Sequence, residues 1–109
     1  MIHGGTELVN QSKREARWAF CLALFHAGEP GLSFASFLTI ARDMRWQFSD
    51  QQVEELLRYL EEAGYCTIDE HSTPMGNGLW ATRTNGLVDL VEYNADCPPA
   101  IARPDKKWW

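Results

Sequence analysis

The spacing of apolar residues first predicts a long helix near the start of the chain. Apolar side chains recur at helical intervals from Ser12 to about Ala27, with Trp18, Leu22 and Phe25 at i, i+4 and i+7. The next stretch, "HAGEPG", holds two glycines and a proline, which stop helical propagation. Because this helix is apolar on much of its circumference, we expect it to pack centrally.

Capping residues and apolar spacing predict two further helices. The second begins at Ser33, a favourable N-cap, and its apolar positions are Phe34, Phe37, Leu38, Ala41 and Met44. The third begins at Ser49, which forms a capping box with Gln52 three residues later, and ends at Gly64. Its apolar stripe is Val53, Leu56, Leu57 and Leu60.

A β-hairpin is predicted after the third helix. The stretches "YCTIDE" and "LWATRT" alternate apolar and polar residues, and the turn-forming "HSTPMGNG" separates them. Beyond Gly86, "LVDLVEYN" fits a short helix or an extended arm, and the prolines of "ADCPPAIARPDKKWW" exclude a long helix. The predicted fold is mainly α with a small antiparallel β-hairpin, of the α+β class. We expect a flexible N-terminus at 1–11, one domain at 12–93 and an extended, proline-rich tail at 94–109.

Charge is distributed unevenly along the 109 residues. The formal net charge is −5, from ten Lys and Arg against fifteen Asp and Glu. Residues 49–102 hold two of the bases, Arg58 and Arg83, against ten carboxylates, which gives −8. Such a field disfavours non-specific contact with nucleic acid or an anionic membrane.

The composition predicts a globular chain, and the spacing of its cysteines and histidines indicates neither a catalytic nor a metal site. Apolar residues make up 45% and charged residues 23% of the chain. The run "WAFCLALF" is too short to span a bilayer, and the polar start is no secretory signal, so we expect a cytoplasmic protein with no membrane partner. Three widely spaced cysteines indicate free thiols, and His3, His26 and His71 stand too far apart for a zinc site. We expect no enzyme activity, metal or cofactor.

The order of predicted elements over residues 12–86 carries a family resemblance. Helix, helix, tight turn, helix, strand, wing and strand resemble the winged helix-turn-helix domain of small bacterial regulators in the MarR, ArsR and PadR groups. The spacing from Leu60 to Gly64, and from there to Thr82 or Thr84 and Gly86, is similar to the spacing of these residue types in that family. The tail stretch "ADCPPAIARP" is similar to the ends of small winged-helix proteins from Mu-like prophages. The resemblance implies a three-helix core with a wing, and a dimeric transcription regulator of bacterial or prophage origin.

The resemblance also implies a surface that reads duplex DNA. In that family the third helix enters the major groove, and the candidate DNA-binding residues here are Arg42, Arg45, Gln47, Gln51, Gln52 and Arg83. The composition of the third helix opposes this interpretation, because Glu54, Glu55, Glu61 and Glu62 repel phosphate, and the wing "EHSTPMGNG" holds no Lys or Arg. The resemblance keeps duplex DNA as the first expected partner. The alternative is that the chain is an acidic winged-helix adaptor that binds another protein.

Tryptophans are the candidate residues for a protein interface. The four candidates are Trp18, Trp80, Trp108 and Trp109. Trp18 also stands at core spacing in the first helix, which favours packing. The C-terminal "KKWW" either docks on a partner or second copy, or folds back over its own domain. We expect a homodimer that forms through the first helix and the C-terminal region.

Overall fold

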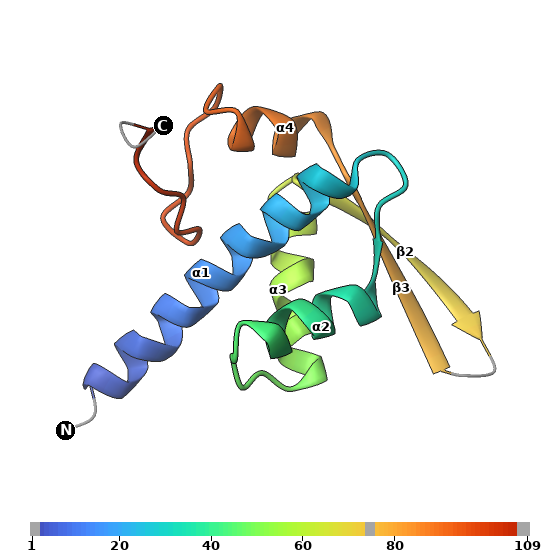
Figure 1. Cartoon of the computed structure of the whole chain (residues 1–109), viewed down its shortest axis with the longest axis horizontal. Helices are drawn as coiled ribbons and strands as arrows, with labels where there is room; N and C mark the ends of the chain where they lie inside the picture. The colour runs from blue at the N-terminus through green and yellow to red at the C-terminus, as the bar shows by residue number, and fades with distance from the viewer. Residues whose placement is uncertain (1–2, 74–75, 107–109) are drawn as a thin grey trace.

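The chain folds as a mixed α+β structure with four helices and a small antiparallel sheet in its described part (Figure 1). This computed structural model describes the backbone of residues 3–73 and 76–106, and side chains within 11–70 and 78–106. The elements are α1 His3–Ala27, β1 Leu32–Ser33, α2 Phe34–Asp43, α3 Asp50–Glu62, β2 Cys66–Thr73, β3 Gly76–Arg83 and α4 Asn85–Val91. The α+β class predicted from the sequence is thereby confirmed.

Helix α1 begins at His3, nine residues before the expected start at Ser12. Residues 6–11 contain no proline or glycine, and extending a formed helix is easier than nucleating one. Figure 1 shows α1 crossing in front of α3, with its N-terminal end projecting from the body. The hairpin projects on the opposite side, and the Cα radius of gyration is 14.2 Å, compared with about 13 Å for a compact chain of this length.

The sheet holds the predicted hairpin and one additional short strand. Strands β2 and β3 pair antiparallel with Ile68 opposite Ala81, as the alternating pattern predicts. The long loop predicted at "HSTPMGNG" is wrong, because the pairing continues through residues 71–73 and 76–78 to Thr73 opposite Gly76. Strand β1 pairs with the other edge of β3 through Leu32 opposite Ala81 and Ser33 opposite Trp80, so the order is β1-β3-β2. A strand of two residues is too short to show alternation, which is why the sequence did not predict β1.

The hydrophobic core lies between α1, α2, α3, α4 and the inner face of the sheet. Its fully buried large side chains are Phe20, Phe37, Leu24, Leu57, Leu60, Leu87, Leu90, Val53 and Cys21. Phe20 of α1 meets Phe37 of α2 edge to face, with ring centroids 5.0 Å apart. The predicted stripe of α3 is buried, as are Phe37 and Ala41 of α2 and Trp18 of α1. Met44, which the apolar spacing of the second helix included, is 55% exposed because it lies at the C-cap of α2, and Leu87 and Leu90 come from α4.

Local hydrogen bonds fix both ends of α3. The Ser49 Oγ accepts from the Gln52 amide at 3.1 Å, and the Gln52 Oε1 accepts from the Ser49 amide at 2.8 Å. This confirms the predicted capping box. At the other end the Tyr65 amide donates to the Leu60 carbonyl at 2.9 Å, and Gly64 has a φ of +88°. The direction of α3, and of the side chains on it, is thereby defined at both ends.

The C-terminal segment, residues 94–106, packs back on α1. The segment is irregular, and residues 87–91 of the stretch "LVDLVEYN" belong to helix α4 rather than to an extended arm. The Ala102 amide donates to the Arg14 carbonyl at 3.1 Å, and Arg17 Nη1 donates to the Ala100 carbonyl at 2.9 Å. Ile101 is 2% exposed and belongs to the core. The core therefore continues past residue 93.

Candidate interaction site on helix α3

The outward side of α3 forms a strongly acidic surface. We define the acidic face of α3 as Asp50, Gln51, Glu54, Glu55, Arg58, Glu61 and Glu62, which are all exposed or half-buried. Five of these residues carry a carboxylate and one carries a base. Since the leucine stripe of the same helix is buried in the core, this face is held toward solvent.

The one base of the acidic face, Arg58, is surrounded by carboxylates. Its Nη1 lies 3.1 Å from Glu61 Oε1, its Nε lies 3.6 Å from Glu54 Oε2, and its Nη2 contacts Glu70 of β2. The hydrogen bond to Glu61, followed by that to Glu70, raises the pKa of Arg58 despite an opposing effect of burial. The positive charge of Arg58 is therefore already neutralised by this chain.

A solvent-open hollow of about 670 Å³ lies along the acidic face. Apart from residues of that face, Phe34 of α2 and Tyr59 of α3 line it. The guanidinium of Arg17 lies 4.7 Å from the centre of the Tyr59 ring, while its Nη1 donates to the Ala100 carbonyl. Burial lowers the pKa of Arg17, against a smaller opposing effect of Tyr59. The hollow thus combines aromatic surface with carboxylates.

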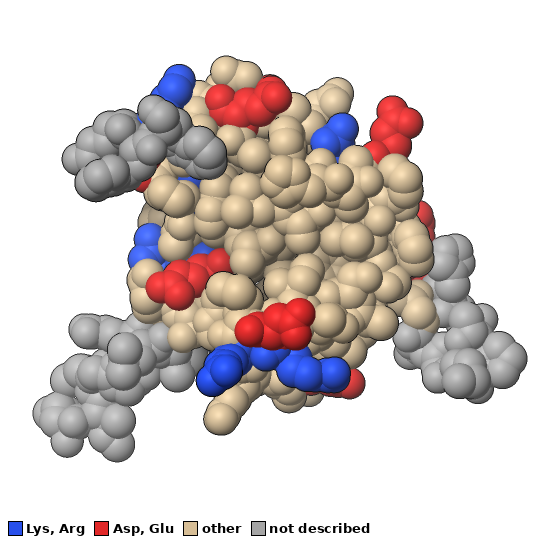
Figure 2. Space-filling view, in the orientation of Figure 1, with Lys and Arg blue, Asp and Glu red and all other residues tan. Residues whose placement is uncertain are grey.

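The predicted DNA-binding residues fall into two places. Arg42, Arg45 and Gln47 are exposed around the turn between α2 and α3, and Gln51 is exposed on the first turn of α3. Both basic and acidic atoms appear where this turn lies, at the lower edge of Figure 2. Gln52 lies there too, in the capping box, so the described structure gathers five of the six candidates near the N-terminal end of α3, whereas Arg83 lies on β3.

Two of the six candidates, Gln52 and Arg83, make hydrogen bonds within the chain. The Gln52 side chain accepts from the Ser49 amide in the capping box. Arg83 Nη1 donates to the Phe25 carbonyl at 2.8 Å, and its guanidinium lies 5.5 Å from the centre of the Phe25 ring. Arg83 thus closes the C-terminal end of α1. The sequence did not indicate this contact, because residues 25 and 83 belong to different elements.

Arg45 adopts a backbone conformation that arginine rarely uses. Its φ is +63°, and it follows α2 with its amide donating to the Arg42 carbonyl at 2.9 Å. A left-handed conformation costs about 1–2 kcal/mol for a residue with a Cβ. A glycine at this position would avoid that cost, but part of the stability gained is lost because glycine has more conformational freedom in the unfolded chain. We expect Arg45→Gly to raise the free energy of unfolding by about 0.5–1 kcal/mol, measured by urea denaturation. A decrease would show that the Arg45 side chain contributes stabilising contacts.

The tryptophan candidates have different surroundings. Trp18 is 8% exposed and belongs to the core. Trp80 is 40% exposed on β3, and its Nε1 donates to the Pro30 carbonyl at 2.7 Å. Trp108 and Trp109 lie outside the described residues. Trp80 is therefore the described candidate that is available to a partner at the surface.

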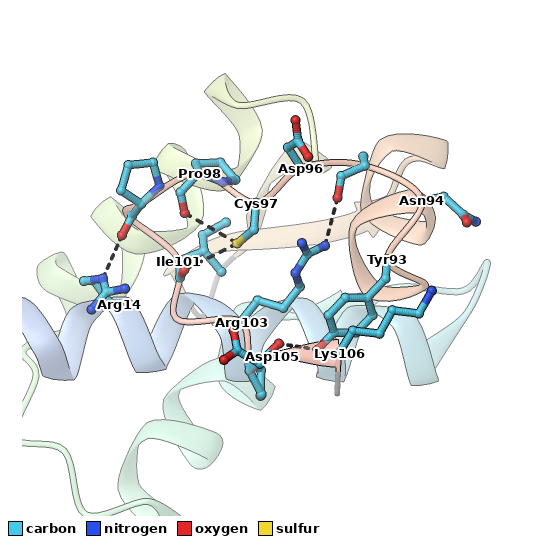
Figure 3. Close-up of a pocket in the computed structure, with 13 residues that line it drawn as sticks. Arg14, Tyr93, Asn94, Asp96, Cys97, Pro98, Ile101, Arg103, Asp105 and Lys106 are labelled. Carbon is cyan, nitrogen blue, oxygen red and sulfur yellow. Dashed lines mark hydrogen bonds between the residues drawn. The ribbon is translucent and has the colours of Figure 1, made fainter. Parts of the chain in front are cut away.

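A second hollow, of about 840 Å³, is formed mainly by the C-terminal segment (Figure 3). The Arg103 side chain lies at its centre in Figure 3, and Arg103 Nη1 donates to the Leu90 and Ala95 carbonyls, both at 2.9 Å. The guanidinium also lies 4.3 Å from the centre of the Tyr93 ring. Since these contacts are within the chain, they hold the segment in its folded path.

The three cysteines differ in their accessibility. Cys21 and Cys66 are buried, and burial raises the pKa of both thiols to about 12. Cys97 is half-buried in the C-terminal segment. Only a thiolate attacks thiol reagents, and a raised pKa keeps the thiol protonated at neutral pH. We expect a thiol-reactive dye at pH 8 to label Cys97 in the folded chain, and Cys21 and Cys66 only after denaturant is added. Mass spectrometry of the labelled peptides would measure this, and rapid labelling of Cys21 in the native chain would contradict it.

The described part of the chain has neither a metal-binding cluster nor a membrane-spanning helix. Within residues 11–70 and 78–106, whose side chains are described, no group of three or more His, Cys, Asp or Glu is placed to hold a metal ion. No helix in that part of the chain is long and apolar enough to cross a membrane. Comparison with protein-family models, with curated proteins and with solved structures finds no match. A functional interpretation therefore depends on the surface of α3 and its surroundings.

Proposed function

We propose that this chain is a winged-helix-type adaptor that binds a basic protein surface through the acidic face of α3. The order of helices and the sheet order β1-β3-β2 support a winged-helix arrangement, in which α3 occupies the position of the recognition helix. The observation that carries the proposal is the pairing of Arg58 with Glu54, Glu61 and Glu70.

Electrostatics favour a protein partner over DNA at this face. Affinity for duplex DNA comes largely from Lys and Arg on phosphates, and most hydrogen bonds in such complexes go to the backbone. The acidic face of α3 offers no unpaired base for these contacts, because Arg58 is its single base. A surface rich in Lys and Arg meets the opposite condition, since complementary charge steers association and fixes register.

DNA binding is the second candidate function, favoured by the turn between α2 and α3. Arg42, Arg45, Gln47 and Gln51 are exposed there, beside the N-terminal end of α3. The partial positive charge of a helix N-terminus adds to the two arginines. In this arrangement only the start of α3 approaches the bases, and the acidic remainder points away from the phosphates. The order of elements resembles that of winged-helix transcription regulators, which is the reason to test DNA binding.

The proposal predicts that two carboxylates of α3 are needed for a basic partner. The probe is a fluorescein-labelled synthetic peptide rich in Lys and Arg, titrated with the full chain and followed by anisotropy. We expect Glu54→Gln with Glu55→Gln to weaken binding about tenfold, because charge pairs across an interface lose their attraction.

A matched pair of substitutions in and directly after α4 separates a local effect from net charge. Asp89→Asn with Glu92→Gln removes the same two charges from exposed positions. We expect this control to change the dissociation constant less than about twofold, since separated surface charges are screened. Equal losses in both double variants would mean that the peptide responds to the overall charge of the chain, and would contradict a site on α3.

A further inference from the structure

We propose that the basic partner of α3 supplies an extended segment, which binds as an additional strand along the outer edge of β2. The proposal rests on the proposed function and adds the backbone conformation and the position of that segment. β2 lies at one end of the order β1-β3-β2, so one of its edges pairs with β3. No strand of the described residues pairs with the other edge, which we call the outer edge. In Figure 1 the outer half of β2 projects from the body of the molecule.

The register of the hairpin shows which backbone groups lie on the outer edge. The Thr84 amide donates to the Tyr65 carbonyl at 3.2 Å, so these two residues form a hydrogen-bonded pair at the base of the hairpin. Along an antiparallel ladder, such pairs alternate with pairs whose N–H and C=O groups point away from the partner strand. Counted from Tyr65 in the same register, Ile68 and Glu70 therefore direct their amides and carbonyls to the outer edge.

β2 lacks the structural features that commonly protect an edge strand. Natural edge strands are often very short, or carry a bulge, a proline or a lysine. The eight residues of β2 contain no proline, lysine or arginine, and pairing with β3 continues without a bulge from Cys66 to Thr73. The outer edge therefore offers a regular row of donors and acceptors, to which an extended segment can bind through its backbone.

The charges beside the outer edge identify a basic segment as its occupant. Asp69 and Glu70 are exposed, and as neighbours on a strand they lie on opposite sides of the sheet. Glu70 contacts Arg58, which joins the outer edge to the acidic face of α3. The Cβ atoms of an added strand would lie about 5 Å from those of β2. Lys or Arg side chains on the α3 side of that strand would therefore meet Glu70 and the acidic face.

The same charges disfavour a second copy of this chain at the outer edge. Two β2 strands paired edge to edge would bring Asp69 and Glu70 of one copy close to those of the other, and each chain carries a net charge of −5. Like charges opposite each other destabilise a sheet. A nucleic-acid backbone is disfavoured too, because β2 has no Lys or Arg for phosphates. The occupant that fits is an extended, Lys- and Arg-rich segment of another protein.

The test is amide hydrogen exchange of the full chain, followed by NMR with and without a peptide that alternates Lys or Arg with Thr or Val. Alternation places the bases on one side of an extended strand, and Thr and Val favour that conformation. At saturating peptide we expect exchange of the Ile68 and Glu70 amides to slow at least about tenfold, because they gain acceptors. The Thr67 and Asp69 amides point toward β3 and should exchange slowly already in the free chain.

Two results distinguish the added strand from the proposed function. If the peptide binds by anisotropy but leaves the Ile68 and Glu70 amides unprotected, the added strand is wrong and the basic partner still stands. If the peptide does not bind, both are wrong. Protection of these amides in the free chain that increases with its concentration would overturn the proposal in favour of a second copy.

A pair of substitutions at Glu70 provides a second measurement. Glu70→Pro and Glu70→Gln both remove the carboxylate, but only proline also removes the N–H that points to the outer edge. Proline is tolerated on an edge strand where this N–H would face solvent, so circular dichroism should remain native. We expect Glu70→Pro to bind the peptide at least about tenfold more weakly than Glu70→Gln. Equal affinities of the two folded variants would contradict a strand added at β2.

Discussion

Replacing Gly31 with alanine should destabilise the fold by about 3 kcal/mol or more. Gly31 lies between α1 and β1 with a φ of +75°, a conformation that disfavours any residue with a Cβ. A Cβ built there would lie 2.3 Å from the Ala81 carbonyl oxygen and 2.9 Å from Trp80 Nε1. Both neighbours belong to β3, opposite β1, so the substitution should push β1 from the sheet. Urea denaturation followed by circular dichroism measures the loss.

Gly64 provides the matched control for Gly31. Its φ is also positive, at +88°, yet a Cβ there would meet nothing within 4 Å. Gly64→Ala should therefore cost only the conformational term, about 1 kcal/mol. Similar losses at both positions would show that Gly31 matters for its φ alone, and that β1 and β3 do not approach each other as closely as described.

Replacing Ile101 with alanine should have the second large effect. Ile101 is 2% exposed, and it belongs to the core although it lies in an irregular segment near the end of the chain. Truncating a buried isoleucine removes its transfer free energy and leaves a cavity, so we expect a loss of about 3 kcal/mol. Chemical denaturation measures it, and an unchanged slope with urea would show that the folded state stays compact.

A substitution at an exposed position of the same segment completes this test. Asp96→Ala changes an exposed side chain and should alter stability by less than about 0.5 kcal/mol. If Ile101→Ala changed the free energy of unfolding as little as Asp96→Ala, the C-terminal segment would not contribute to the core. The hydrogen bonds between this segment and α1 would then have to be loose in solution.

Local patterns predicted much of the fold. The capping box at Ser49, the leucine stripe of α3 and the alternation of β2 and β3 each depend on residues close in sequence, and each is present. Helix α2 likewise begins after its predicted N-cap, because the Ser33 Oγ accepts from the Ser36 amide. Such short-range signals were sufficient to predict a three-helix core with a hairpin.

Contacts between segments distant in the sequence could not be predicted from local patterns. β1 has two residues and exists only because β3 pairs with it. Ile101 gives no periodic signal in a proline-rich stretch, and the backbone contacts of residues 99–102 with α1 depend on the folded path. Arg58 and Glu70, which pair between α3 and β2, are similarly twelve positions apart in the sequence. The negative charge of the third helix was plain from the sequence, whereas the neutralisation of its one base needed the structure.

The most direct test of the α3 site compares two probes on two proteins. The natural chain and Arg58→Gln are each titrated at low salt against the labelled Lys- and Arg-rich peptide and against a labelled DNA duplex. We expect the natural chain to bind the peptide and not the duplex, and Arg58→Gln to bind the peptide more tightly, because Glu54, Glu61 and Glu70 lose their internal partner. Binding of the duplex by the natural chain, weakened by Arg58→Gln, would contradict a protein-binding α3.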